Sequence, residues 1–100
     1  MSYRDVRIKV IKKLETDEVF EEYAGENARP SCPALNVGDE FVSRNMGMPE
    51  GFCSWAWADI HRDVVHLSMG GEFSWIKGEG RMVSCCTDGL RPVLFELKRL

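Results

Sequence analysis

The sequence lacks any long hydrophobic run, and none of its apolar stretches approaches the roughly 20 residues that a helix needs to cross a bilayer. Its first residues alternate charged and apolar side chains, so they lack the continuous apolar core of a secretory signal. We therefore expect no membrane partner and a cytoplasmic location, a compartment in which thiols are normally kept reduced.

A surplus of positive charge is also missing. Lys and Arg together number 13 against 16 Asp and Glu, a formal net charge of -3, and the two signs are interspersed along the chain. A surface that binds DNA or RNA has to neutralise phosphates and is usually basic. We therefore expect no nucleic-acid partner.

Internal repeats, low-complexity tracts and linker-like segments are not found in the sequence. The chain has 100 residues, within the common range for one domain, and 44% of them are hydrophobic, including three Trp and five Phe. This is enough apolar surface to bury one modest core. We therefore expect a single domain that covers residues 1–100.

Several segments have the pattern of strands. Between residues 3 and 13 apolar side chains alternate with charged ones, the period of a strand with one buried face. Residues 37–43 predict a turn that leads into a short second strand. Residues 81–85 and 92–100 predict two further strands, joined through a turn at residues 88–89.

Two helices are expected between these strands. Residues 15–24 predict a short amphipathic helix with Thr16 as its N-cap. Residues 52–69 predict the main helix, with Asp59 and Asp63 on its solvated face. Apolar side chains recur on this helix at three- and four-residue steps, forming a stripe that faces the core: Cys53, Ala56, Trp57, Ile60, Val64 and Leu67.

The order of these elements is strand, helix, strand, helix and hairpin. The connections are too short for repeated parallel crossovers. The sequence therefore predicts an α+β fold in which a small, mainly antiparallel sheet of three to four strands carries the longer of two helices on one face.

Chemistry in this chain would depend on four cysteines, Cys32, Cys53, Cys85 and Cys86. In a reducing compartment they point away from a disulfide framework and leave metal binding, redox chemistry or plain burial. Four sulfurs are the right number for zinc or an iron–sulfur centre, although the sequence lacks the paired Cys-x-x-Cys knuckles of familiar zinc sites. Zinc and an iron–sulfur centre are therefore candidate cofactors, with all four cysteines as candidate ligands.

Cys53 is a candidate catalytic thiol. If Gly51 is the N-cap of the main helix, Cys53 lies in the first turn, where free amide groups and the helix dipole favour a thiolate. Alternatively, Cys53 starts the apolar stripe and behaves as a small buried hydrophobic side chain, which is common for free cysteine. The sequence leaves both interpretations open.

Cys85 and Cys86 are the other candidate thiols. Neighbouring side chains on a regular strand point to opposite faces, so these two converge only if the strand ends between them. The turn residues at 87–89 make such a break plausible. The alternative is that one sulfur lies in the core and the other on the opposite face.

Arg91 and Asp88 flank the same turn and are candidate ligand-binding residues. Arg91 can present a fork of donors to a carboxylate or phosphate, and Trp55, Trp57 and Trp75 could wall the pocket around it. The alternative is a salt bridge within the turn, with the tryptophans in the core or at an interface.

Four segments together resemble one protein family: residues 32–33 (CP), 37–41 (VGDEF), 51–59 (GFCSWAWAD) and 85–93 (CCTDGLRPV). It is a family of small, uncharacterised single-domain proteins of bacteria and archaea, many of them anaerobes. The resemblance covers nearly the whole chain, and its GFCxWAW and CCTDGLRPV motifs are specific. It implies that the cysteines and tryptophans belong to the family pattern, but it brings no established activity. An anaerobic setting would suit exposed thiols or an oxygen-sensitive centre.

The sequence thus predicts an intracellular protein whose four cysteines form a reduced cluster for thiol redox exchange or soft-metal binding. Whether it is an enzyme stays undecided. Two other classes of function remain open: a structural or interaction module, as a homodimer or accessory subunit with buried cysteines, and a binder of a small anionic ligand. The relative positions of the four sulfurs distinguish these classes.

Overall fold

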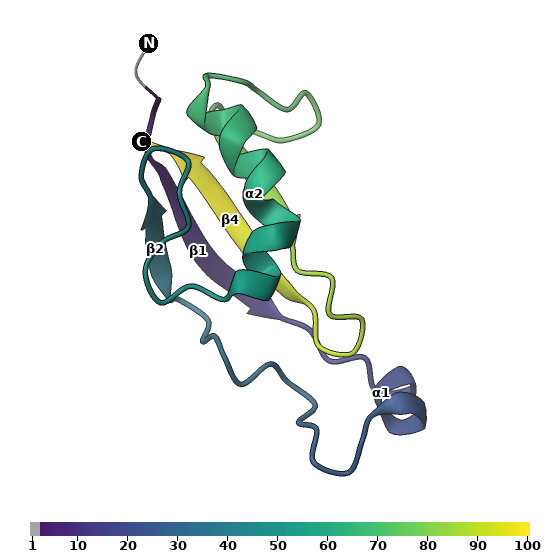
Figure 1. Ribbon diagram of the computed structural model, residues 1–100. Coiled ribbons are helices and arrows are strands. Elements are labelled where there is room, and N and C mark those ends of the chain that lie inside the picture. Colours follow the sequence, from purple (N-terminus) through teal and green to yellow (C-terminus); the bar gives the residue numbers. More distant parts are fainter. Residues whose placement is uncertain (1–2) are drawn as a thin grey trace.

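The computed structural model describes residues 3–100 and arranges them as an α+β fold. The elements are β1 (Val6–Lys13), α1 (Glu18–Tyr23), β2 (Glu40–Ser43), α2 (Ser54–Ser68), β3 (Arg81–Cys85) and β4 (Val93–Arg99). The strands form one antiparallel sheet in the order β2-β1-β4-β3, and α2 lies across one face of it (Figure 1). The predicted fold class is confirmed.

The core lies between α2 and the sheet. Over residues 6–10 of β1 and 93–97 of β4, every second side chain is fully buried, because alternate residues of a strand point to the same face. These strand residues are Val6, Ile8 and Val10 together with Val93, Phe95 and Leu97. They meet the apolar stripe of α2, which buries Ala56, Ile60, Val64 and Leu67.

The central pairing of the sheet joins β1 to β4. It runs from Val6 opposite Arg99 to Lys13 opposite Val93, with a bulge at Ile11, where the register shifts by one residue. The end of β1 therefore lies beside the start of β4. Lys13 and Val93 become neighbours there, next to the loop that connects β3 to β4.

Two carboxylates attach helix α2 to β3 and to the loop that follows it. Asp63 is only 6% exposed and accepts a hydrogen bond from the Ser84 hydroxyl at 2.5 Å. Asp59 accepts bonds from the backbone N–H and the hydroxyl of Thr87. The expectation of a solvated position is therefore wrong for Asp63, because α2 turns this side toward β3, whereas Asp59 is half-buried and contacts an exposed loop.

Helix α1 differs from its prediction. It spans six residues, none of them buried, and Val19 and Tyr23 are 48% and 75% exposed. Thr16 is not the N-cap, because Asp17 takes that position while the Thr16 hydroxyl donates to the Leu90 carbonyl at 2.9 Å. The amphipathic pattern is present, but the sheet offers no face to cover it.

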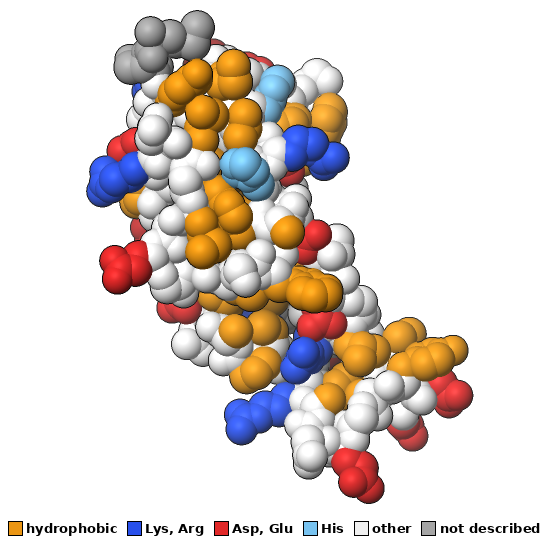
Figure 2. All heavy atoms as spheres, viewed as in Figure 1, with side chains coloured by type: hydrophobic (Ala, Val, Ile, Leu, Met, Phe, Trp, Pro, Cys, Tyr) orange, Lys and Arg blue, Asp and Glu red, His pale blue; other side chains and the backbone are white. Residues whose placement is uncertain are grey.

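The molecule is elongated, with extents of 49 × 29 × 20 Å. Helix α1 lies beyond the end of β1, away from α2, and residues 24–39 return from it toward β2 (Figure 1). Hydrophobic side chains are visible at this end of the molecule beside several acidic ones (Figure 2). Within residues 3–100, no helix combines the length and apolar character needed to span a bilayer.

Candidate functional site

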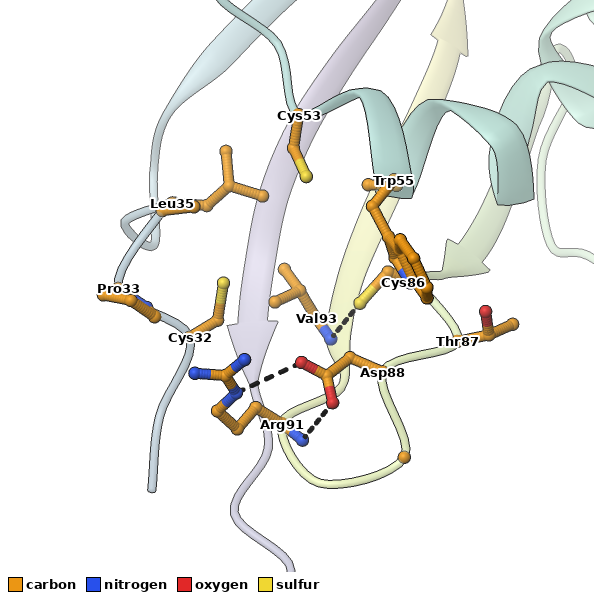
Figure 3. Close-up of a pocket in the computed structure, with 13 residues that line it drawn as sticks. Cys32, Pro33, Leu35, Cys53, Trp55, Cys86, Thr87, Asp88, Arg91 and Val93 are labelled. Atoms are coloured by element: carbon orange, nitrogen blue, oxygen red, sulfur yellow. Dashed lines mark hydrogen bonds and ion pairs between the residues drawn. The ribbon is translucent and has the colours of Figure 1, made fainter. Parts of the chain in front are cut away.

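A pocket of about 520 Å³ opens where three segments meet: the loop of residues 24–39, the start of α2 and the β3–β4 loop of residues 86–92. We call it the thiol pocket, because three of the four cysteines line it (Figure 3). Its wall is mostly apolar and consists of Cys32, Pro33, Ala34, Leu35, Cys53, Trp55, Ala56, Cys86, Thr87, Asp88, Gly89, Arg91 and Val93.

Cys53 reaches the thiol pocket from the N-terminus of α2. The chain turns at Gly51, whose φ of 77° favours glycine, and Phe52 then packs its ring against Phe41 and Phe95 in the core. Cys53 is itself the N-cap, and its carbonyl accepts the N–H of Trp57. It thus lies just before the first turn, two positions earlier relative to the helix start than expected, with a half-buried thiol.

Cys32 enters the same pocket from the long loop. Its side chain is half-buried, and it packs against the core together with Cys53. The two sulfurs point into the pocket from different walls, Cys53 from α2 and Cys32 from the loop (Figure 3). Residues far apart in the sequence therefore share one cavity.

Cys86 forms part of the pocket floor. It is 7% exposed, and its Sγ accepts a hydrogen bond from the backbone N–H of Val93 at 3.3 Å. Its own N–H donates to the Val93 carbonyl at 3.0 Å, which extends the β3–β4 ladder one residue beyond β3. The Cys86 thiol is therefore held in place by the backbone.

Cys85 does not line the thiol pocket. Its side chain is exposed, and its thiol donates to the Cys86 carbonyl at 3.0 Å. Partial desolvation raises the pKa of the Cys85 thiol, and the neighbouring Cys86 and Asp59 raise it further. Although β3 ends at Cys85, the pairing of Cys86 with Val93 keeps the alternation of side chains, so the two adjacent sulfurs point to different sides. The raised pKa means that Cys85 favours its protonated form.

Asp88 and Arg91 lie in the β3–β4 loop and line the thiol pocket. The Arg91 Nε lies 3.1 Å from Asp88 Oδ2, and Asp88 Oδ1 accepts the N–H of Leu90 at 3.1 Å. The salt bridge within the turn is thus formed, and the same two side chains also face the pocket (Figure 3). The two interpretations of this pair are compatible.

The tryptophan at the pocket is Trp55, which is 67% exposed. Trp57 lies outside the pocket and packs on Phe52 and His61, with ring centroids 6.2 and 5.0 Å apart. Trp75 is also outside, in the loop after α2, where it packs on Phe73. The helical spacing assigned Trp57 to the apolar stripe, but it contained no signal that distinguished Trp55 as the pocket residue.

The structure does not bring all four cysteines together as a metal site. Across residues 3–100, no three His, Cys, Asp or Glu side chains are close enough to hold one metal ion. Cys85 lies outside the pocket, and the other three sulfurs are spread over its wall and floor. The tetrahedral set expected for zinc or an iron–sulfur centre is therefore not formed in this conformation.

Comparisons of the chain with models of known protein families, with curated proteins and with solved structures found no match. The family resemblance of the GFCxWAW and CCTDGLRPV motifs stays a prediction. The function of the thiol pocket has to be argued from its own geometry.

Proposed function

We propose that the thiol pocket performs thiol–disulfide exchange with a small disulfide, with Cys53 as the attacking thiol and Cys32 as the resolving thiol. One observation carries the proposal: cysteines from three segments far apart in the sequence line a single apolar pocket. Buried free cysteine is common on its own. Packing alone gives no reason for two half-buried thiols to point into the same accessible cavity.

The surroundings of each sulfur support its role. Cys53 is the N-cap of α2, and its half-buried side chain opens into the pocket from the fixed end of this helix. Cys32 lies in irregular backbone, which adjusts more readily than a helix or strand. Cys86 is held by Val93, and the raised pKa of Cys85 keeps that thiol protonated, so neither is assigned to the reaction.

The reaction takes place in two displacements. The Cys53 thiolate attacks one sulfur of a disulfide RSSR, so that a bond from Cys53 to that sulfur forms, the RS–SR bond breaks, and RS⁻ leaves and takes a proton. Cys32 then loses its proton to solvent and attacks the Cys53 sulfur, expelling the second RS⁻. The protein loses two electrons as its disulfide forms, and RSSR gains them as it becomes two RSH.

Serine variants test this assignment. With a small disulfide present, Cys32→Ser should stop at a stable mixed disulfide on Cys53, whereas Cys53→Ser should lose the rapid reaction. Cys85→Ser is the matched control, because Cys85 is exposed but outside the pocket, and it should react as the unmodified protein does. A Cys53→Ser variant that reacts at full rate would contradict the proposal, and intact-mass spectrometry reads each outcome.

Soft-metal binding ranks behind exchange. Cys32, Cys53 and Cys86 share the pocket, but no three-ligand group is preformed anywhere in residues 3–100, so a metal would have to draw these sulfurs together. Purification without oxygen, followed by elemental analysis, tests this alternative. A stoichiometric metal that disappears in Cys53→Ser would favour it over exchange.

A protein-interaction module is the second candidate function. Helix α1 buries none of its residues, and Tyr23 and Trp75 are 75% and 71% exposed. Large exposed apolar side chains often mark surfaces that another protein covers. Light scattering at several concentrations tests self-association, and a strict monomer whose pocket exchanges disulfides would count against a homodimer.

A further inference from the structure

A second hollow of about 420 Å³ adjoins the thiol pocket, and the two cations Lys13 and Arg29 give its lining a positive charge. We call it the basic pocket. It shares Cys32 and Pro33 with the thiol pocket, so the proposed resolving thiol lies where the two cavities meet. Lys13 and Arg29 also line the basic pocket, together with Ser31 and Asn36, and no acidic residue does.

The two cations of the basic pocket are available to a ligand. Within residues 3–100, neither Lys13 nor Arg29 takes part in an ion pair, although six other pairs are formed. Lys13 ends β1 directly opposite Val93, which lines the thiol pocket. The sheet register therefore fixes one cation close to the site of exchange.

A third cation lies on the thiol-pocket side. The Arg91 guanidinium is on the same side of the thiol pocket as Cys32 (Figure 3). Asp88 pairs with its Nε and offsets part of its charge. Cations thus line both of the cavities that share Cys32, whereas Cys53 lines only the mainly apolar thiol pocket.

We propose that the basic pocket binds a carboxylate of the substrate, so that the substrate class is a low-molecular-weight disulfide, or the corresponding thiol, that carries carboxylates. This inference rests on the exchange proposed for Cys53 and Cys32. The apolar thiol pocket accommodates the disulfide, and Lys13 and Arg29 hold the acid group beyond Cys32. The fork of an arginine and the point charge of a lysine both suit a carboxylate.

Three disulfides of different charge test the inference on the full-length protein. The probes are glutathione disulfide with carboxylates, bis(2-hydroxyethyl) disulfide without charge, and cystamine with amines. Each rate of protein oxidation is divided by the rate of the same disulfide with a free small thiol. We expect the normalised rate to be highest for glutathione disulfide and lowest for cystamine, and we expect added salt to reduce the difference.

The double variant Lys13→Gln/Arg29→Gln identifies the residues. The loss of two solvent-accessible charge contacts, each worth about 0.2–1 kcal/mol, should lower the rate with glutathione disulfide about two- to thirtyfold. The rate with bis(2-hydroxyethyl) disulfide should not change. Lys12→Gln is the matched control, because Lys12 is an exposed neighbour of Lys13 that does not line the basic pocket, and it should leave all three rates unchanged.

The outcomes separate this inference from the proposed function. Equal normalised rates for the three disulfides would overturn carboxylate recognition while leaving exchange intact. If the double variant reacted more slowly by the same factor with charged and uncharged disulfides, carboxylate recognition would also be overturned. No reaction with any probe would overturn the exchange itself. If the double variant fails to fold, the three rates of the unmodified protein still decide whether carboxylates are preferred.

Discussion

The sulfur of Cys86 accepts a hydrogen bond from the backbone N–H of Val93 at 3.3 Å, and the Cys86 N–H donates to the Val93 carbonyl at 3.0 Å. This double contact extends the pairing of β3 with β4 past Cys85. Alternation along a strand then sends Cys85 to the other side, where it is exposed. The two adjacent cysteines therefore have different roles, one in the pocket floor and one outside the pocket.

Removal of the Cys86 sulfur should destabilise the protein. Cys86→Ala leaves a small cavity and takes away the acceptor of the Val93 N–H, so we expect a loss of about 1–3 kcal/mol in the free energy of unfolding. Cys85→Ala should change this free energy by about 0.5 kcal/mol or less, as is usual at exposed positions. Urea denaturation measures both. Equal losses would show that the Val93 contact is not specific to Cys86.

Alkylation should discriminate between Cys53 and Cys85. At neutral pH iodoacetamide should modify Cys53 faster, because Cys53 opens into the thiol pocket whereas the raised pKa of Cys85 keeps that thiol protonated. The raised pKa of the Cys85 thiol means that its reaction should accelerate only at more alkaline pH than for an ordinary cysteine. Peptide mapping after timed quenching gives the two rates. Faster modification of Cys85 at neutral pH would contradict the assignment of the attacking thiol.

The buried carboxylate of Asp63 depends on Ser84. Ser84→Ala removes the hydroxyl donor of Asp63 Oδ2 and leaves only the Arg62 Nε, 3.6 Å from Oδ1, so it should cost about 1–3 kcal/mol of unfolding free energy, the usual penalty for a buried polar group that loses its hydrogen bond. Ser74→Ala, at an exposed position in the loop after α2, is the control and should have little effect. If both variants unfold at the same urea concentration, the Asp63–Ser84 bond does not hold α2 to β3.

Acid should destabilise the protein by protonating Glu96, which lies on the face of the sheet opposite α2. Burial acts to raise the pKa of the Glu96 carboxyl, but hydrogen bonds from Arg7 and Arg81 outweigh it and lower the pKa below its ordinary value of 4.5. Because the pKa of Glu96 is lower in the folded state, its ionised carboxylate stabilises the fold fully at pH values above 4.5. This stabilisation is lost as the pH falls through the folded-state pKa.

Replacement of this group should remove that pH dependence. Glu96→Gln should lower the melting temperature at pH 7, and its melting temperature should fall less than that of the unmodified protein as the pH drops below 4.5. Thermal unfolding followed by circular dichroism at several pH values measures both curves. Parallel curves would mean that Glu96 does not titrate differently in the folded and unfolded states.

The fold was largely predictable because its elements follow strict periods. The alternation of Val6, Ile8 and Val10 and the three- and four-residue steps of α2 each define one buried face, and the structure buries both. Helix α1 has an equally amphipathic pattern but no partner. A pattern identifies the face that an element can bury, whereas the rest of the fold decides whether anything covers it.

The site was only partly predictable for a related reason. Strand geometry correctly raised the alternative that Cys85 and Cys86 lie on different faces, and the pairing with Val93 decides it. Cys32 lies in a loop without periodicity, so its approach to Cys53 depends on the path of residues 24–39 through space. The basic pocket around Lys13 and Arg29 depends on the same path.

The most direct test of the account is a map of the disulfide that forms in the unmodified protein. The protein is oxidised with a small disulfide, its remaining thiols are alkylated, and it is digested without reduction for mass spectrometry. The account predicts one peptide pair joined through Cys32 and Cys53, with Cys85 and Cys86 alkylated. Cys32 and Cys53 found alkylated after this treatment, with Cys85 the oxidised residue, would contradict it.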